Sequence, residues 1–460
     1  MEVIMTKRTK KLISADSSAK SSPVKISRRQ AIQSIGAVAG VAAIGINAPY
    51  VNARQKTIRF LNGEPSVQSV RAMRFAAAQY EKETGVKVQM DSIPAGKAYQ
   101  KVQTSIKGGK PYDIATLIFL GDVLILAAEK QLVPLNDIIK KYDWGPRILF
   151  PMDGNNYWYP YDYNLCWINY RMDLYKKAGL KEPRSWQQLS DNMAALIGGG
   201  EDKTDKGIVH PIASSGATNY TSFGYMWAQG VELFDNNWNV ILDSPDMKKK
   251  AVEYLDFFES IVPKMPDGLA KAGWGVLVSG IQTGQLSHCP GTGRLIDVIN
   301  VKNSELASNI GIFPFPSSDG RNVALNHGYD GWVVLDTPMT DEALKFLEWF
   351  SDEHLINFLH TSPVHYQPTR LDIYEDPRWL SHPDLEKFSH ITRWQKRFIT
   401  DPNVIIRSID TEGPYPDVRA GKVFRSYALP EMLQNKVLKK MPSEKCVEIA
   451  ASKIREISAS

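Results

Sequence analysis

Strand and helix patterns alternate along the chain from residue 56 onward, and this alternation predicts an α/β fold. The first stretch has the order β-α-β-α-β-α, which is typical of a mostly parallel sheet covered by helices on both faces. A second α/β stretch begins near Tyr163, and no long linker rich in Pro, Gly or Ser separates it from the first. We therefore expect two α/β lobes joined by short crossovers.

In the first stretch, short apolar runs bounded by turn residues predict strands at 56–61, 86–90 and 113–119. Ser66 can cap a helix after the first strand, because a serine oxygen accepts a hydrogen bond from a free backbone N–H. That helix is expected to end at Gly85, since glycine tolerates the left-handed conformation of a helix end. Further helices are expected around residues 99–106 and from Gly121 onward.

The second stretch carries helix caps at several points. Ser185 with Gln188 three residues later predicts a capping box. Ser244 followed by Pro245 predicts another helix start. Ser443 is expected to cap the last helix. Strands are also expected at 286–289 and 331–335, and helices at 171–178, 295–301 and 341–350.

Residues 1–53 read as an export signal. A basic region ends in Arg28 and Arg29, an uncharged run of Ala, Gly, Ile and Val follows, and residues 51–53 offer Val-Asn-Ala to a signal peptidase. This pattern resembles a twin-arginine signal; the alternative is a Sec signal with a chance arginine pair. We expect cleavage before Arg54 and a periplasmic or extracellular location.

Charge and cysteine content exclude several classes of function. The chain has 55 Lys and Arg against 50 Asp and Glu, but eight of these bases and two of these acids lie in the leader. The remaining 47 bases and 48 acids give a body charge of −1, which argues against binding to nucleic acid or an anionic membrane. Cys166, Cys289 and Cys446 are widely spaced, so we expect buried thiols, at most one disulfide and no metal cluster.

The informative segments are 111–114 with 129–135, 168–180, 183–189, 229–235 with 244–245, and 327–334 with 343–349. Their order and composition resemble family 1 of the extracellular solute-binding proteins, the sugar-binding group of ABC transporters. Departures from the family pattern are Gln131 and Val231 in place of glycines, and Tyr329-Asp330 where small residues are usual. The family patterns that these segments resemble are "PDI … GLVPL" for 111–114 with 129–135, "YYNKDLFKKAGL" for 168–180 and "PxTWxEL" for 183–189.

This resemblance implies a two-lobed periplasmic-binding-protein type II fold with hinge crossovers, a ligand bound between the lobes, and delivery to ABC permease subunits. It also implies a monomer that binds a mono- or oligosaccharide and uses no cofactor. Carried over by segment, lobe one comprises residues 56–162 and 326–370. Lobe two comprises residues 163–325 and 371–460.

Ligands of open α/β sheets bind beyond the carboxyl ends of the strands, so the loops there supply the first candidate site residues. Carboxylates could accept hydrogen bonds from ligand hydroxyls, although Glu64 and Asp122 could equally complement helix dipoles. The glycine-containing loop before Arg294 could contact a polyol, bind a phosphate or form a simple turn. The candidates from these loops are Asn62, Glu64, Asp122, Gly291, Thr292 and Arg294.

Aromatic residues supply the second set of candidates, because sugars stack their C–H faces on aromatic rings while carboxylates bind their hydroxyls. Tyrosine, tryptophan and aspartate alternate at both presumed crossovers. For any single Trp the alternative is packing in the core. These candidates are Tyr161, Asp162, Trp227, Trp274, Tyr329, Asp330 and Trp332.

An enzyme is not expected from this sequence. It contains no G-x-S-x-G, H-E-x-x-H or P-loop motif. The spacing of His354, His360 and His365 does not place all three on one helical face, so no metal site is expected. A glycosidase would need two carboxylates around a cleft, and no spacing nominates a pair. The remaining rivals are a binding protein for polyamine or iron and a glycoside-acting enzyme.

Overall fold

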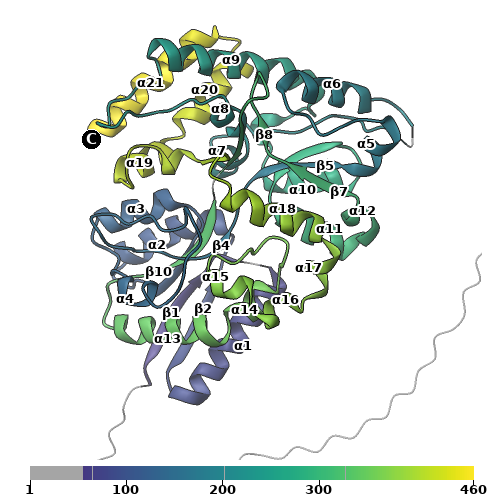
Figure 1. Cartoon of the computed structure of the whole chain (residues 1–460). Helices are drawn as coiled ribbons and strands as arrows, with labels where there is room; N and C mark the ends of the chain where they lie inside the picture. Colours follow the sequence, from purple (N-terminus) through teal and green to yellow (C-terminus); the bar gives the residue numbers. More distant parts are fainter. Residues whose placement is uncertain (1–54, 65, 201, 327) are drawn as a thin grey trace, which may run out of the picture. The chain divides into compact units, whose positions relative to one another are not determined.

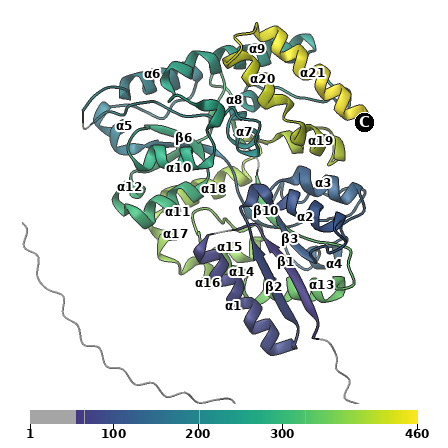
Figure 2. The same cartoon turned by 180° about the vertical axis from the view of Figure 1, so that it is seen from behind.

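The computed structural model describes residues 55–64, 66–200, 202–326 and 328–460. Residues 55–460 form one compact unit (Figure 1 and Figure 2). The expected export signal and its cleavage before Arg54 lie outside the described residues.

A five-stranded sheet with the order β2-β1-β3-β10-β4 organises the first lobe. β1 pairs in parallel with β2 and β3, as expected, whereas β10 is antiparallel to both β3 and β4. The expectation of a mostly parallel sheet is therefore wrong for the half that contains β10, because that strand returns from the second lobe and runs in the opposite direction. The strands are β1 (Thr57–Asn62), β2 (Lys87–Ser92), β3 (Ile114–Leu117), β4 (Tyr159–Tyr163) and β10 (Tyr329–Val334).

Helices cover both faces of this sheet. Alternation along β1 sends Ile58 and Phe60 into one core cluster and Leu61 into the other. The first face is covered by α1 (Val67–Thr84), α13 (Thr340–Glu353) and α14 (Leu355–Leu359), and the other by α2 (Ala98–Lys107) and α3 (Leu120–Ala128). The short elements η1 (Ala95–Lys97) and α4 (Asn136–Ile139) complete this region.

The second lobe contains two small sheets, β6-β5-β7 and β11-β9-β8. β5 pairs antiparallel with β6 and β7, while β9 is parallel to β11 and antiparallel to β8. The strands are β5 (Trp167–Arg171), β6 (His288–Gly291), β7 (Ile310–Phe313), β8 (Phe315–Pro316), β9 (Val323–Asn326) and β11 (Ile405–Arg407). Between them lie α5 (Met172–Ala178), α6 (Trp186–Leu196), α7 (Gly216–Thr221), α8 (Gly224–Ala228), α9 (Pro245–Ile261), η2 (Val262–Lys264), η3 (Leu269–Lys271), α10 (Trp274–Gln282), α11 (Gly293–Lys302) and α12 (Ser304–Ser308).

The C-terminal region contacts both lobes. Ile373 and Trp379 join the first lobe's core, whereas Trp394 packs edge-to-face on Trp167 of β5, with ring centroids 6.2 Å apart. The elements here are α15 (Leu371–Tyr374), α16 (Pro377–Leu380), α17 (Pro383–Lys387), α18 (Ser389–Thr400), η4 (Ile409–Thr411), α19 (Val418–Ser426), α20 (Ala428–Val437) and α21 (Ser443–Ala459). In both views α19 lies beside α3 of the first lobe (Figure 1 and Figure 2).

Local capping follows the sequence at both ends of α1 and in part at Ser185. The side chain of Ser66 accepts from the backbone N–H of Ser69, and Gly85 ends α1 with a φ of 75°. The Ser185 side chain accepts from Gln188 N, but the Gln188 side chain accepts from Arg184 N instead of completing the capping box.

Two predicted caps differ in the structure. Ser244 precedes α9 with Pro245 at its first position but makes no side-chain capping bond. The last helix begins at Ser443 with Pro442 as its N-cap, because the Ser443 hydroxyl donates to Asp256 instead.

Cys166, Cys289 and Cys446 are buried free thiols. In the part of the chain that the structure describes, no helix is long and apolar enough to cross a membrane.

Candidate functional site

Three chain segments meet where the two lobes join. β4 ends at Tyr163 and leads into β5, and β10 begins shortly after β9. The third segment, residues 361–370, runs along β4: Tyr163 N donates to Gln367 O over 2.9 Å, and Thr369 Oγ1 donates to Pro160 O over 2.7 Å. Side chains on these segments are therefore brought together although they are far apart in sequence.

Asp162 and Asp330 lie opposite each other in the β4–β10 ladder, next to an irregularity in its register. Asp330 N donates to Asp162 Oδ1 over 2.7 Å, and both residues are at most 1% exposed. Burial raises the pKa of both carboxyls well above the ordinary value, and a second carboxyl adds to each shift: Asp330 for Asp162, and Glu64 for Asp330. Like charges directly opposite in a ladder are destabilising, so this pair needs a positive or hydrogen-bonding partner.

An ion pair spans the lobes beside these aspartates. Glu64, after β1, accepts from Arg294 Nη2 over 2.7 Å and from Tyr366 OH over 2.6 Å. Burial alone would lower the pKa of Arg294, but Tyr366 and Glu64 raise it above the ordinary value. Asn62 shapes the turn that presents Glu64, since its side-chain amide donates to Glu64 O over 2.8 Å. Thus Asn62, Glu64 and Arg294, three of the candidates from the strand-end loops, lie together.

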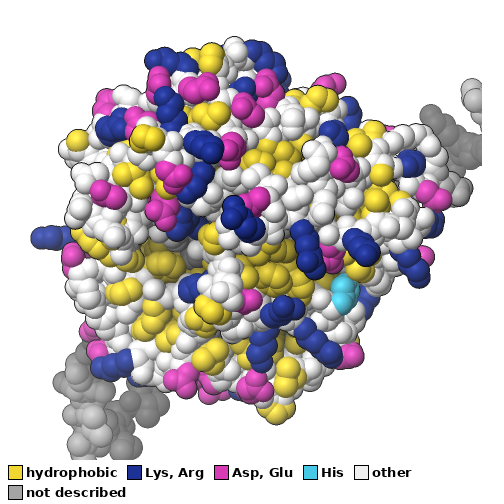
Figure 3. Space-filling model, turned by 45° about the horizontal axis from the view of Figure 1, so that its top comes forward, with side chains coloured by type: hydrophobic (Ala, Val, Ile, Leu, Met, Phe, Trp, Pro, Cys, Tyr) yellow, Lys and Arg dark blue, Asp and Glu magenta, His cyan; other side chains and the backbone are white. Residues whose placement is uncertain are grey.

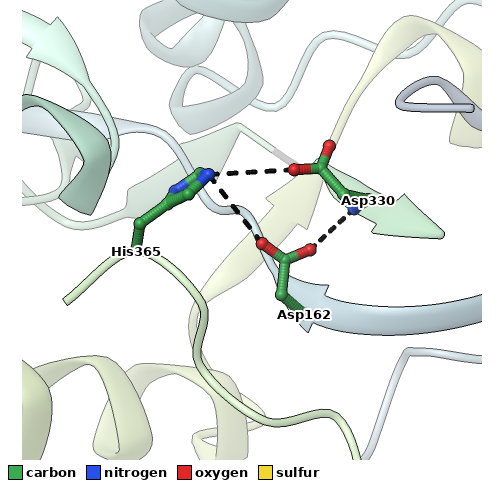
Figure 4. Close-up of side chains that lie close together, drawn as sticks. All are labelled: Asp162, Asp330 and His365. Atoms are coloured by element: carbon green, nitrogen blue, oxygen red, sulfur yellow. Dashed lines mark hydrogen bonds and ion pairs between the residues drawn. The ribbon is translucent and has the colours of Figure 1, made fainter. Parts of the chain in front are cut away.

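His365 connects the aspartates to the start of α11. Its Nε2 lies 3.7 Å from Asp330 Oδ2 and 4.0 Å from Asp162 Oδ2 (Figure 4). Its Nδ1 is 3.2 Å from Thr292 Oγ1, and its backbone N–H donates to Asp297 Oδ2 over 3.1 Å. Burial lowers the pKa of His365 well below its ordinary value, and Arg294 adds to the shift, so the imidazole is neutral.

The glycines of the loop before Arg294 serve packing. A Cβ on Gly293 would stand 2.1 Å from Val364 O, so only glycine lets α11 start against the 361–370 segment. Gly291 has ordinary clearance, with Asn169 Nδ2 at 3.4 Å. Thr292 caps α11 by accepting from Arg294 N over 3.2 Å.

A second contact between the lobes uses Asp122. Its carboxylate forms a two-pronged ion pair with Arg425 of α19, while Gly121 N donates to Asp410 Oδ2 over 2.9 Å. Burial raises the pKa of Asp122 to about 6, although Arg425 opposes the shift. Asp122 therefore helps to join the two lobes and does not belong to the cluster around Glu64.

The candidate aromatics divide between core and cluster. Trp332 is 2% exposed and packs on Tyr161, with ring centroids 4.5 Å apart, and on Phe350 at 5.1 Å. Within the described residues the Tyr161 hydroxyl is buried without a hydrogen-bond partner. Its pKa is raised first by burial and then by Asp330 and Glu64, which places it beside the cluster.

The other three aromatic candidates contact residues outside this cluster. The Tyr329 hydroxyl donates to Arg147 O, and Trp227 is fully buried in the second lobe, where its Nε1 donates to Asn326 Oδ1 over 2.8 Å. Trp274 is partly buried at the start of α10, and its ring approaches the Gly291 backbone. A stacking role for Trp227 and Trp332 is therefore not favoured, since their ring faces are used by the core.

Sequence reasoning missed four members of the cluster: Tyr366, His365, Asp297 and Asn164. Asn164 Nδ2 lies 3.4 Å from both carboxylate oxygens of Asp330. The available signal was the stretch 362–370, where Pro, His, Tyr, Gln and Arg follow a helix without apolar periodicity. Such a stretch reads as a loop, and loops carry binding residues disproportionately often.

The buried cluster can accept and donate several hydrogen bonds. Carboxylates, a guanidinium, two phenols, an amide and a neutral imidazole converge on it from both lobes. The face shown in Figure 3 is hollowed, and hydrophobic side chains gather in the hollow among Lys and Arg side chains. A small number of polar groups that converge from separate segments is typical of small-molecule sites.

Comparisons with known proteins agree with this fold. The family model described as "Bacterial extracellular solute-binding protein" matches residues 64–353. A putative ABC transporter periplasmic-binding protein of Escherichia coli K12, YcjN, is 32% identical over 107 residues. That match covers 22% of this chain and 24% of the relative, so the chain matches about a quarter of the curated relative's length.

Solved structures match over most of their length. A Thermotoga lettingae solute-binding protein with α-D-tagatose has a TM-score of 0.71 and 18% identity, covering 88% of this chain and 100% of that chain. The GacH receptor of Streptomyces glaucescens, solved unliganded and with acarbose, has a TM-score of 0.71 and 17% identity, covering 88% and 99%. An Agrobacterium radiobacter protein with ribitol has a TM-score of 0.70 and 17% identity, covering 87% and 98%.

These likenesses confirm the two-lobed type II periplasmic-binding-protein fold that the sequence predicted. The family match spans more than half of the chain and includes β2 to β10. The chain belongs to the bacterial extracellular solute-binding protein family.

Proposed function

We propose that this protein is the solute-binding component of an ABC import system and binds a carbohydrate or polyol between its lobes. The bound solute would be delivered to a membrane permease after export of the chain through the signal in residues 1–53. The protein would act as a monomer, without a catalytic step.

One observation carries this proposal: Glu64 of the first lobe pairs with Arg294 of the second in a buried network that includes Tyr366. A ligand hydroxyl can donate to Glu64 and accept from Arg294 at the same time. The pair would then exchange its internal bond for bonds to the ligand, which couples ligand binding to lobe closure. The solved proteins of this fold bind tagatose, acarbose and ribitol, which supports a polyhydroxyl solute class.

The lobe division is part of the same proposal. We place the first two crossings at β4–β5 and β9–β10, close to the boundaries at 162/163 and 325/326. Since α15 and α16 pack with the first lobe's core, we place the third crossing after Leu380 instead of at residue 370.

A thermal-shift panel of sugars, polyols, polyamines, amino acids and ferric chelates tests the function. A bound solute at a hundredfold excess over its dissociation constant stabilises the folded state by about 2.7 kcal/mol. We expect the shift with a sugar or polyol, and we expect Glu64→Gln and Arg294→Gln to abolish it. The exposed residues Glu305 and Arg74 supply matched controls, Glu305→Gln and Arg74→Gln, which should keep the full shift.

Other outcomes would redirect the proposal. A thermal shift only with spermidine or only with ferric chelates would show that the solute is a polyamine or iron and not a sugar or polyol. Turnover of a glycoside substrate would show an enzyme. An undiminished sugar shift in both Glu64→Gln and Arg294→Gln would place the solute elsewhere.

A further inference from the structure

Three acceptor atoms converge in the β4–β10 ladder beside the Glu64–Arg294 pair. One oxygen each from Asp162 and Asp330 and one ring nitrogen from His365 all lie within 4.8 Å of one another. Figure 4 shows the imidazole directed at both carboxyl groups, with the three residues coming from three separate segments. All three side chains are buried, at most 4% exposed.

The surroundings orient each of these groups and leave one atom without a partner. Asp162 uses Oδ1 to accept from Asp330 N, and His365 Nδ1 contacts Thr292 Oγ1. Within the described residues Asp162 Oδ2 has no hydrogen-bond partner, although it is buried and faces His365 Nε2. Leaving a buried carboxylate oxygen unpaired costs several kcal/mol in an apolar environment, so a positively charged partner is expected there.

The charge balance of the cluster points the same way. Counted as ions, the carboxyls of Glu64, Asp162 and Asp330 and the guanidinium of Arg294 sum to a formal charge of −2. A bound metal ion displaces any proton that its carboxyl ligands carry. Asp297 lies behind His365 and accepts its backbone N–H over 3.1 Å. One divalent cation would neutralise the net charge of the three carboxyls and the guanidinium. Hydrogen bonds from the surrounding residues would hold the metal-binding side chains in position.

The separations suit a single ion better than a sugar. Metal–ligand distances of about 2.0–2.2 Å place tetrahedral ligand atoms roughly 3.4 Å apart. The observed 3.7 Å and 4.0 Å need only a small contraction, whereas a sugar ring cannot enter between atoms this close. An imidazole nitrogen together with two carboxyl oxygens favours zinc-like transition metals over Mg²⁺ or Ca²⁺.

We propose that Asp162 Oδ2, Asp330 Oδ2 and His365 Nε2 bind one divalent transition-metal ion of the zinc class. The ion joins β4, β10 and the 361–370 segment, so it stiffens the junction between the lobes. A fourth coordination position remains for water. This site goes beyond the proposed function, because it requires no solute.

Titration calorimetry of the chelator-treated full chain with Zn²⁺, in the absence of any sugar, tests the proposal. We expect one Zn²⁺ per chain and a higher melting temperature with Zn²⁺. Asp162→Asn keeps the acceptor for Asp330 N while removing the charge, and His365→Gln removes the ring nitrogen. Both variants should weaken binding by more than about tenfold.

Asp336→Asn and His390→Gln change exposed residues of the same types and should bind Zn²⁺ like the wild type. Circular dichroism confirms that each variant is folded before titration. Absence of a stoichiometric Zn²⁺ site in the wild type, or equal binding by folded Asp162→Asn and His365→Gln, would overturn the proposal. Because no sugar is present, either result leaves the solute panel as a separate test.

Discussion

Replacing Arg425 by Met should destabilise the protein in a pH-dependent way. Arg425 is the two-pronged partner of Asp122, whose side chain is 2% exposed. With Arg425 present, burial still raises the pKa of Asp122 to about 6, so the group is ionised at pH 7 and mostly protonated at pH 5. In Arg425→Met the pKa of Asp122 rises further, so its carboxyl is protonated at both pH 5 and pH 7.

The magnitude follows from this titration. A carboxyl with a raised folded-state pKa stabilises the fold below its unfolded pKa and loses that contribution as the pH rises through the folded value. One pH unit separates pH 7 from the wild-type pKa of about 6, so Arg425→Met should cost about 1.4 kcal/mol more at pH 7 than at pH 5. The lost charge-assisted hydrogen bonds add about 1.5–3 kcal/mol at either pH.

Urea unfolding followed by tryptophan fluorescence at pH 5 and pH 7 measures both the pH-dependent and the pH-independent loss of stability. Asp122→Asn removes the titrating group, so adding Arg425→Met to the Asp122→Asn variant should cost the same at the two pH values. Arg419 on the same helix pairs with Asp417 at a more exposed position, and Arg419→Met should cost no more than about 1 kcal/mol. Equal losses for Arg425→Met at pH 5 and pH 7 would refute the assignment of a buried, Arg-held carboxylate.

Further predictions concern stability. Trp332→Ala should cost about 3–5 kcal/mol in chemical unfolding, because the ring fills the first lobe's core; a loss below 1 kcal/mol would contradict its burial. Gly421→Ala places a Cβ 2.5 Å from Gly121 O and should cost about 1–3 kcal/mol, whereas Gly275→Ala meets nothing within 4 Å and should be nearly neutral. Burial lowers the pKa of His210 to about 3 and of His288 to about 4, so both resist protonation in the fold. The free energy of unfolding should therefore fall as the pH drops from 6.5 towards 4, by up to about 1.4 kcal/mol per pH unit per histidine. His210→Asn should make this pH dependence less steep in acid unfolding. An unchanged slope would show that His210 does not contribute to it.

Much of the fold could be predicted because its signals are local. Ser66 and Gly85 bound α1, and Gly179 ends α5 with a φ of 65°. Each depends on one residue's own hydrogen-bonding or backbone preference. The antiparallel entry of β10 carries no such signal, since strand direction depends on how the chain passes between the lobes.

The candidate site could be predicted only in part. Glu64, Asp162, Asp330 and Arg294 lie together because strand ends and helix starts gather at one edge of a sheet. Trp332 was expected to face a ligand, but the side of the sheet on which it lies is decided by packing against α13 and α14.

His365 and Tyr366 could not be predicted as members of the cluster, because tertiary contacts bring them there. The 361–370 segment reaches the cluster through backbone pairing with β4, and Gly293 permits the contact with α11. Neither contact leaves a periodic pattern in the sequence. A histidine in such a stretch is indistinguishable from a surface loop residue until the pairing is known.

The most direct test of the central claim is a crystal structure of the protein with the solute that gives the largest thermal shift. We predict that a sugar or polyol lies between the lobes with hydroxyl groups within hydrogen-bonding distance of Glu64 and Arg294. A solute bound outside the junction of the lobes, with the Glu64–Arg294 pair still joined and buried, would contradict the account.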